Sequence, residues 1–358
     1  MAEASLAKAG SAGSTNSPAP PWDGKLRVGK QATVVEHGSG SEDGEDDAVP
    51  QAEIEADEDL LEGESADAEE IDCQHSRVAS MAALRLERFA RLKRLGLRQN
   101  RITRIQVPST CAAGLEELEL YDNLIKHMDG LDECMALRSL DLSYNKLRHI
   151  RGLAACTRLE QLYLVQNRIT DMGDQLAPLT HLTCLELGAN RIREIRGLDG
   201  LTRLHSLWLG GNRIARLDGL APCAALRILS IQANRLTSLA GLAALPALTE
   251  LYVSDNQIAD LAPVAACPEL RVLDVQSNPV VRLAGLEGLA RLENLWAGHC
   301  GIDAFDEIAR VLADKARLEE VYFEGCPVQL RQPVLYRNKV RLALPQVDKI
   351  DAGEWVRV

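Results

Sequence analysis

An asparagine recurs along the chain at nearly constant spacing, and this periodicity constrains the fold more than any other feature. Nine such residues follow one another in steps of 22 or 23 residues: Asn100, Asn123, Asn145, Asn167, Asn190, Asn212, Asn234, Asn256 and Asn278. The next step of 22 residues reaches Cys300, and a longer step of 26 residues reaches Cys326. A period of this length is typical of stacked structural units, each of which buries its apolar face against its neighbours.

The residues around each marker follow one frame, L-x-x-L-x-L-x-x-N-x-I-x-x-I-x-x-L, which is the pattern of leucine-rich repeats. The L-x-L pair predicts a short strand with two inward leucines and an outward residue between them. The asparagine is expected to turn the chain and to bond backbone groups inside the stack. We therefore predict an α/β leucine-rich repeat solenoid with a curved parallel sheet on its concave face. Short helical, 3-10 or extended segments are expected on the convex side.

Both ends of the repeat depart from the frame, as is expected of caps that shield a stacked core from water. Ile71 and Cys73 fit the strand positions of a degenerate first rung, with Val78 after its turn. We place the solenoid at 71–327, with about eleven full rungs plus this first one, and a C-terminal cap at 328–358. The segment "YRNKVRLALPQVDKID" is expected to give the cap a polar surface. Helical periodicity explains the 26-residue step, through Phe305, Ile308, Val311 and Leu312.

The acidity of the chain is concentrated before the repeats. The net charge is −12, yet residues 1–76 alone hold 19 acidic and 4 basic side chains. Such a composition buries too little apolar surface to offset chain entropy. We predict that residues 1–70 form a disordered acidic tail.

The sequence gives no sign of a membrane or secreted protein. No stretch approaches the roughly 18 apolar residues of a membrane helix, and the first residues lack the apolar run of a secretory signal. The nine cysteines favour a reducing, intracellular setting. Four of them fall eleven residues before a marker, which predicts small buried side chains and no metal site: Cys134, Cys156, Cys223 and Cys267.

No pattern in the chain predicts catalysis or a cofactor. "GKLRVGKQ", residues 24–31, has the spacing of a phosphate-binding loop, but it lacks the Ser or Thr that binds Mg²⁺ and no strand precedes it. A stripe of basic residues follows the markers. We interpret it as a solvated edge that pairs with nearby acids, and we expect no nucleic-acid partner. The stripe consists of Arg101, Lys146, Arg168, Arg191, Arg213 and Arg235.

The residue four places before each marker is the most informative about function. We call these eleven outward positions the concave column: Gly96, Glu119, Asp141, Tyr163, Glu186, Trp208, Ser230, Tyr252, Asp274, Trp296 and Tyr322. Five of them are aromatic in a chain that is 4% aromatic, four are acidic and none is basic. Strand alternation keeps these side chains out of the core, so burial of the core does not explain them.

Two hypotheses account for the concave column. Aromatic rings on neighbouring strands could stack and stabilise the sheet. However, Glu186 and Ser230 separate Tyr163, Trp208 and Tyr252 in the sequence, which favours a protein-binding surface with aromatic anchors and charges that select a basic partner. The residues predicted to bind that partner are Glu119, Asp141, Tyr163, Glu186, Trp208, Tyr252, Asp274, Trp296 and Tyr322. Tyr121 and Tyr144 extend this surface toward the N-terminal rungs.

The phrases "LYLVQNRI", "LELGANRI" and "LWLGGNRI", together with the closing "YRNKVRLALPQVDKID", resemble the protein phosphatase 1 regulatory subunit 7 family. The resemblance covers about residues 71–358. It implies a non-catalytic regulator in the nucleus and cytoplasm whose concave face holds the phosphatase catalytic subunit, with an inhibitor protein able to join the complex. It also implies that the contacts include Asp141, Tyr163, Glu186, Trp208, Asp274, Trp296 and Tyr322.

One position departs from the family. Asn294 stands where the family pattern resembles an acid, and the neighbouring Glu293 is expected to point the other way. The plain repeat also occurs in spliceosomal and axonemal proteins. A generic interaction module in ribonucleoprotein or ciliary assembly is therefore the alternative function.

Overall fold

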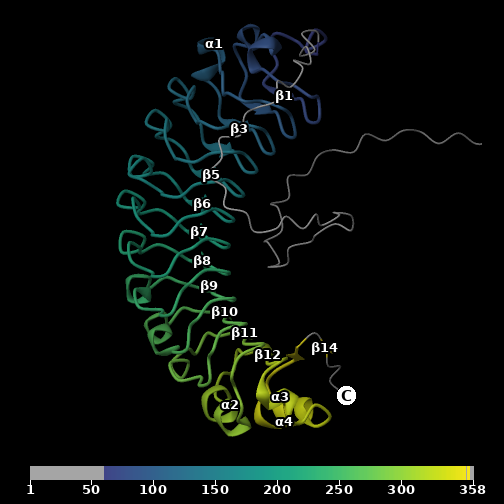
Figure 1. Ribbon diagram of the computed structural model, residues 1–358, viewed down its shortest axis with the longest axis vertical. Helices are drawn as coiled ribbons and strands as arrows, with labels where there is room; N and C mark the ends of the chain where they lie inside the picture. Colours follow the sequence, from purple (N-terminus) through teal and green to yellow (C-terminus); the bar gives the residue numbers. More distant parts are fainter. Residues whose placement is uncertain (1–59, 352, 355–358) are drawn as a thin grey trace, which may run out of the picture. The chain divides into compact units, whose positions relative to one another are not determined.

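The computed structural model describes residues 60–351 and 353–354, and these form one curved stack of rungs (Figure 1). Each rung contributes a strand to a single sheet whose strand order follows the sequence. The strands β1 to β13 run parallel, and β14 pairs with β13 in the antiparallel direction. The predicted leucine-rich repeat fold is thereby confirmed.

The strands are short. Their bounds are β1 Glu70–Asp72, β2 Arg94–Gly96, β3 Glu117–Glu119, β4 Ser139–Asp141, β5 Gln161–Tyr163, β6 Cys184–Glu186, β7 Ser206–Trp208, β8 Ile228–Ser230, β9 Glu250–Tyr252, β10 Val272–Asp274, β11 Asn294–Trp296, β12 Glu320–Tyr322, β13 Lys349–Ile350 and β14 Gly353–Glu354. In β7 the central Leu207 is fully buried, while Ser206 and Trp208 are half-buried on the other face. The register is shared by every rung, so one row of buried apolar side chains, which are leucines from β2 to β11, runs through the core of the stack.

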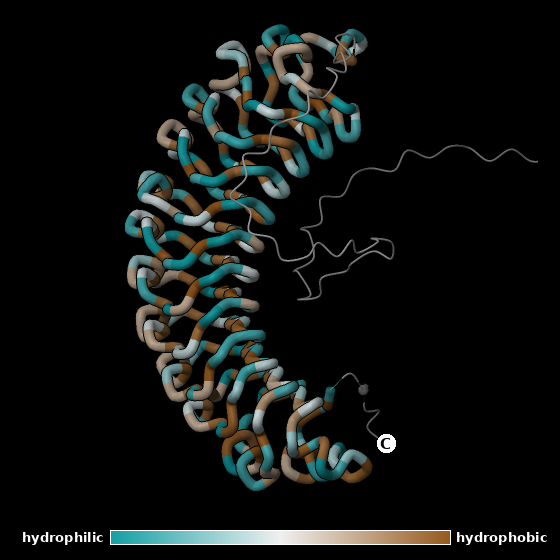
Figure 2. The backbone as a smooth tube through the Cα atoms, viewed as in Figure 1, coloured by the Kyte–Doolittle hydropathy of each residue, from teal (hydrophilic) through white to brown (hydrophobic). Residues whose placement is uncertain are grey.

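Helical segments are few. The α-helices are α1 Ser109–Ala112, α2 Phe305–Leu312, α3 Pro327–Leu330 and α4 Tyr336–Ala343, and the 3-10 helices are η1 Met81–Leu84, η2 Leu86–Arg88, η3 Leu242–Ala244 and η4 Ala262–Ala266. The predicted helical periodicity near residue 305 corresponds to α2, whose Ile308, Val311 and Leu312 are buried. Figure 2 shows hydrophobic segments at the same place in successive rungs. Each fully buried leucine stabilises the stack by roughly 1.5–3 kcal/mol.

The asparagines join the rungs through a repeated set of hydrogen bonds. Asn212 Nδ2 donates to the carbonyl of Leu187 in the previous rung and to that of Leu209 in its own rung, both at 2.9 Å. Its Oδ1 accepts from the backbone N–H of Ile192 at 2.9 Å. A buried turn leaves backbone groups that must find partners, and one amide side chain supplies both a donor and an acceptor. The predicted role of the asparagine is confirmed.

The last two markers are cysteines, and they keep half of this arrangement. Cys300 Sγ lies 3.3 Å from the carbonyl of Val275, and Cys326 Sγ lies 3.0 Å from that of Ala297. A thiol is a weak donor, so these two rungs are bonded less strongly than the asparagine rungs. All nine cysteines are unpaired, and every one except Cys184 is buried. The burial predicted for the four cysteines that precede a marker by eleven residues is confirmed.

The first rung closes the stack at one end. Ile71, Cys73 and Val78 are buried, and β1 pairs with β2 in the common register. Leu61 is also buried and packs on this end of the core. Leu61 belongs to the segment 1–70, for which the sequence predicted disorder. Residues 1–59 of that segment, including the loop-like stretch 24–31, lie outside the described residues.

At the other end, α4 and the strand after it cover the last full rung. Tyr336 and Val340 of α4 are buried. Asp351 is 3% exposed, and its Oδ1 accepts from the backbone N–H of Phe323 and of Glu324 at 2.9 and 3.0 Å. The hydroxyl of Tyr336 donates to the same oxygen at 3.2 Å. One carboxylate thus takes over the acceptor part of the role that an asparagine plays between the inner rungs.

The outer surface of this cap is less polar than the sequence analysis expected. Four large apolar side chains are exposed there: Leu330 (63%), Val334 (88%), Leu335 (53%) and Leu342 (83%). The helical spacing explains the difference, because the buried face of α4 is already occupied by Tyr336 and Val340, and Leu342 lies on the opposite side. Within the described ranges, no helix has the length and apolar character needed to cross a membrane.

Candidate functional site on the concave face

The concave column lies along the sheet as predicted, with one member on each strand from β2 to β12. Strand alternation places its side chains on the face opposite the buried leucines. Most members are half-buried, because residues of adjacent rungs crowd one another at the spacing of parallel strands, about 4.8 Å. Two members are buried, Ser230 at 2% and Asp274 at 5% exposure.

The C-terminal part of the column is a continuous chain of aromatic rings. Trp208 and Tyr252 stack with ring centroids 6.3 Å apart and an interplanar angle of 19°. Tyr252 and Trp296 follow at 6.1 Å and 43°, and Trp296 meets Tyr322 edge to face at 6.3 Å and 77°. We call these four residues the aromatic chain. The separation of Trp208 from Tyr252 by Ser230 was taken above as an argument against stacking, and for this pair that argument was wrong.

The intervening side chains explain how the rings meet. Trp208 and Tyr252 lie two rungs apart, which is about 10 Å of backbone. Ser230 between them is short, so the rings lean over it and close the gap. Tyr252 and Trp296 cover Asp274 in the same way. Burial therefore raises the pKa of Asp274, whose Oδ1 accepts from the backbone N–H of Gln276 at 3.1 Å.

A residue two places earlier on the strand supports one ring of the chain. The hydroxyl of Tyr252 donates to Glu250 Oε2 at 2.8 Å. Sequence reasoning did not single out Glu250, although alternation puts residues i and i+2 of a strand on one face and this was the available signal. At the end of the chain, Lys349 Nζ lies 5.9 Å from the centroid of the Tyr322 ring and 3.1 Å from Glu320 Oε1.

The N-terminal part of the column is acidic, and its carboxylates differ in their partners. Glu119 Oε2 lies 2.6 Å from Arg98 Nε. Asp141 accepts from the backbone N–H of Ser143 at 2.8 Å. For Glu186, the described residues provide no ion pair and no side-chain hydrogen bond that would compensate its charge. We call Glu119, Asp141 and Glu186 the acidic group.

Burial changes the titration of two carboxylates of the acidic group, Asp141 and Glu186. Loss of solvent, followed by repulsion from Asp141, raises the pKa of Glu186 to about 7. Burial also raises the pKa of Asp141. Each pKa unit corresponds to about 1.36 kcal/mol, so ionised Glu186 costs the fold on the order of 3 kcal/mol at high pH. A carboxylate in this state gains from any cation brought next to it.

Tyr163 lies between Asp141 and Glu186 on the sheet. Its hydroxyl donates to Gln161 Oε1 at 3.3 Å, and burial raises its pKa. Beside the column, Tyr121 and Tyr144 form a tilted pair with centroids 4.8 Å apart, and Tyr144 is 44% exposed. The structure thus brings these two rings together next to the acidic group, where the sequence analysis had placed them.

The departure at β11 is also visible. Asn294 is half-buried in β11, two residues before Trp296. Glu293 Oε1 lies 3.3 Å from Arg271 Nη1 and is held by that ion pair. The carboxylate of Glu293 therefore does not replace the acid that the family pattern would put at 294.

The basic stripe agrees with its interpretation in its exposure to solvent and differs from it in its ion pairs. Asp171 and Asp218 pair with arginines outside the stripe, Arg196 and Arg216. Across residues 60–351, no member of the stripe lies within 4.0 Å of an acidic group in an ion pair. The five arginines of the stripe are exposed and Lys146 is half-buried, so the stripe is a solvated edge as predicted. The predicted ion pairs with nearby acids are absent from the described residues.

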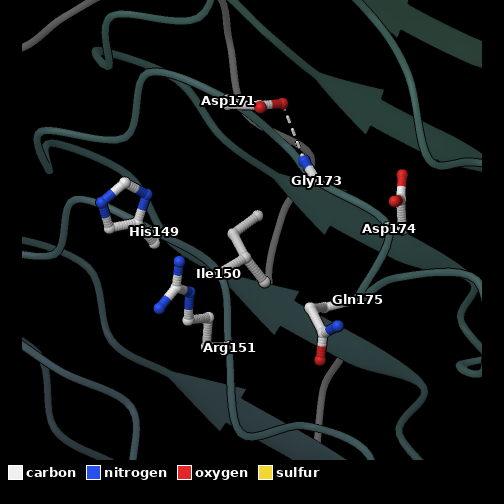
Figure 3. Close-up of a pocket in the computed structure, with 7 residues that line it drawn as sticks. All are labelled: His149, Ile150, Arg151, Asp171, Gly173, Asp174 and Gln175. Atoms are coloured by element: carbon white, nitrogen blue, oxygen red, sulfur yellow. Dashed lines mark hydrogen bonds between the residues drawn. The ribbon is translucent and has the colours of Figure 1, made fainter.

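A small hollow of about 320 Å³ lies among residues that follow Asn145 and Asn167 in the sequence (Figure 3). It is lined by His149, Ile150, Arg151, Asp171, Gly173, Asp174 and Gln175. Asp171 Oδ1 accepts from the backbone N–H of Gly173 at 2.9 Å, and the side-chain bond from Arg196 holds the pKa of Asp171 below its usual range. The charge of Asp171 is thus already compensated by Arg196.

Comparison with known proteins agrees with this geometry. The family model described as "Leucine rich repeat" matches residues 90–155 and 157–214, and the one described as "Leucine Rich repeats (2 copies)" matches residues 224–266. The chain therefore contains leucine-rich repeats and has their fold. Among solved structures, an internalin (InlF) of Listeria monocytogenes is 22% identical with a TM-score of 0.65, covering 83% of this chain and 89% of that one.

A leucine-rich repeat protein of Leptospira interrogans is 21% identical with a TM-score of 0.59, covering 74% of this chain and 73% of that one. These two structures share the fold with this chain. A curated relative is the "Protein phosphatase 1 regulatory subunit SDS22" of Schizosaccharomyces pombe, which is 52% identical over 58 residues. That match spans 16% of this chain and 18% of the relative's length.

Proposed function

We propose that this protein is a non-catalytic regulatory subunit that binds the protein phosphatase 1 catalytic subunit through its concave face. Binding would control the activity, maturation or localisation of the phosphatase, in the nucleus and the cytoplasm. A third, inhibitory protein would be able to join the complex. The partial identity to a phosphatase 1 regulatory subunit supports the choice of partner.

The observation that carries the proposal is the position of Glu186. This carboxylate is half-buried between Tyr163 and Trp208, and the described residues leave it without a counter-charge. Structural side chains on a sheet are normally compensated, because an unpaired buried charge is costly. A partner that brings an arginine or lysine to this position would recover part of the cost, which is a reason to keep an acid there.

The aromatic chain supplies the second half of the proposed surface. Its rings stabilise one another, yet all four remain half-buried, so one side of each stays accessible. Rings that are already held in place lose little conformational freedom on binding, and large aromatic side chains are frequent binding hot spots. We therefore propose a partner with an apolar region facing the aromatic chain and a basic region facing the acidic group.

The proposed contacts are Glu119, Asp141, Tyr163, Glu186, Trp208, Tyr252, Asp274, Trp296 and Tyr322. Eight of them are half-buried on the concave face. Asp274 is the exception, since Tyr252 and Trp296 cover it. We propose that Asp274 acts by supporting those rings through its bond to the backbone of Gln276.

The test is the affinity of the purified full chain for the phosphatase 1 catalytic subunit, measured by biolayer interferometry. We expect the double variant Trp208→Ala, Trp296→Ala to lose at least about 2 kcal/mol of binding free energy, or roughly 30-fold in Kd. The matched control is Met135→Ala with Val281→Ala, because both side chains are exposed apolar groups outside the column. Circular dichroism would verify that both variants remain folded.

Two results would contradict the proposal. Unchanged affinity in the folded double tryptophan variant would exclude the concave face as the binding surface. Absence of the phosphatase among the proteins that co-purify with the wild-type chain, as identified by mass spectrometry, would exclude the partner. In that second case the column would belong to an interaction module for a different basic protein.

A further inference from the structure

The C-terminal cap exposes more apolar surface than a structural cap requires. Leu330 ends α3, Val334 and Leu335 lie in the connection to α4, and Leu342 is near the end of α4. All six residues from 330 to 335 are exposed. We call Leu330, Val334, Leu335 and Leu342 the cap patch.

Nothing in the cap's own packing requires these side chains. Tyr336 and Val340 already form the buried face of α4, and Leu344 continues it. Leu335 and Leu342 are seven residues apart, which places them on one side of the helix after two turns. Exposed apolar side chains grouped in this way on a soluble domain mark interaction surfaces.

The segment that carries the cap patch is rich in basic side chains. Residues 327–347 contain four basic side chains and no acidic one, namely Arg331, Arg337, Lys339 and Arg341. Two of these are anchored to the solenoid: Arg331 Nη1 lies 3.4 Å from Asp303 Oδ2, and Lys339 Nζ lies 5.2 Å from the centroid of the Phe305 ring. The segment still has an excess of positive charge beside its exposed leucines.

From this combination we propose that the cap patch docks an acidic, leucine-bearing polypeptide segment of a partner protein. Leucines of that segment would cover Val334 and Leu342, and its carboxylates would face Arg337 and its neighbours. A second copy of this chain fits less well, because the same basic segment would meet itself and like charges would repel. A membrane surface also fits less well, since α4 has only eight residues and the patch is divided between two helices and their connection.

The cap patch differs from the concave column in its charge and in its position in the fold. The column carries acids and selects a basic partner, whereas the cap patch is basic and selects an acidic one. The aromatic chain ends at β12, and the cap patch begins after it in α3. One molecule could therefore hold two partners of opposite charge, and binding at the cap does not depend on the function proposed for the concave face.

The experiment is a fluorescence anisotropy titration of the full chain with a labelled synthetic peptide of about twelve glutamates and leucines arranged in helical spacing. We expect saturable binding that weakens as salt is added. Val334→Asp with Leu342→Asp should weaken binding at least tenfold, and Arg337→Glu should weaken it several-fold. The matched control is Val281→Asp, which introduces the same charge at an exposed apolar residue outside the cap.

A peptide with lysine in place of glutamate should not bind the cap, and the double tryptophan variant of the concave column should bind the acidic peptide normally. Equal binding of both peptides, or full binding by the Val334→Asp, Leu342→Asp variant, would overturn the proposal. Two other results would also overturn it. One is that the chain sediments with phosphatidylserine vesicles but does not bind the peptide, and the other is that it dimerises in analytical ultracentrifugation. In each case the effect would have to be lost when Val334 is replaced.

Discussion

The two halves of the concave column follow the same repeat pattern but differ in how their side chains interact. From β7 to β12 the rings of the aromatic chain contact one another across rungs, so this half stabilises itself before any partner arrives. From β3 to β6 the acidic group is crowded by its neighbours, and Glu186 has no counter-charge among the described residues. The preformed aromatic chain thus adjoins the acidic group, in which the charge of Glu186 is uncompensated.

This difference teaches how a repeat protein can acquire function. The inward leucines hold the stack whatever the outward residue is, so the outward residue can vary at little structural cost. In the aromatic chain the variation adds stability. At Glu186 it reduces stability, and a partner's cation is the physical explanation we propose for keeping that charge.

The largest expected effect on stability is a difference between the two tryptophans of the aromatic chain. Trp296 contacts two rings, Tyr252 and Tyr322, whereas Trp208 contacts the ring of Tyr252 at one end of the chain. We expect Trp296→Ala to destabilise the fold by about 2–3 kcal/mol and Trp208→Ala by about 1 kcal/mol less, because an aromatic pair contributes roughly 0.5–1.5 kcal/mol. Urea denaturation measures both. Equal losses would show that the ring contacts contribute little.

Replacing Glu186 with glutamine should stabilise the fold, whereas the tryptophan replacements destabilise it. The raised pKa of Glu186 means that the folded state binds a proton more tightly than the unfolded state between about pH 4.5 and pH 7. Stability therefore falls as pH rises through that window, and the loss is complete above it. We expect Glu186→Gln to be more stable than the wild type by about 1–2 kcal/mol at pH 8, after allowance for residual solvent. At pH 4 the two proteins should unfold at the same urea concentration.

Affinity for the phosphatase should also depend on this proton. A cation on the partner favours ionised Glu186, so lowering the pH from 8 to 6 should weaken binding by up to about tenfold, or 1.4 kcal/mol. The Glu186→Gln variant should bind more weakly than the wild type at pH 8, and its affinity should not change between pH 8 and pH 6. Titration calorimetry in two buffers would detect the accompanying proton release. A wild-type pH profile identical to that of the glutamine variant would show that the partner does not meet Glu186.

The smallest effect is expected at Asp274, the acid that lies within the aromatic half. The rings cover it, so its charge is not available to a partner. Asp274→Asn keeps an acceptor for the backbone N–H of Gln276 and should change affinity by less than about threefold. Biolayer interferometry is sufficient to measure this. A loss as large as that of Glu186→Gln would mean that the two halves do not differ in the way proposed here.

Much of the fold was predictable because it is set by local sequence. The frame repeats within 22 or 23 residues, each rung bonds only to the next, and the asparagine carries its donor and acceptor with it. The helix α2 followed from the spacing of four apolar residues. The outward position of the column followed from strand alternation.

The cap surface and the basic stripe were harder to predict. Whether Leu342 is covered depends on which residues of α4 meet the last rung, and whether Arg168 finds an acid depends on pairings already made by Arg196 and others. Such competition between neighbours is not visible in a repeat pattern.

The sequence by itself determined the solenoid, its period, the row of buried leucines and the identity of the residues that face outward. Only the tertiary structure decided how those outward side chains meet. Trp208 and Tyr252 are 44 positions apart and touch because Ser230 between them is short. Glu186 acquires its unusual pKa because neighbours from adjacent rungs exclude water from it. Contacts and solvation arise between rungs, whereas the repeat pattern describes only what lies within one.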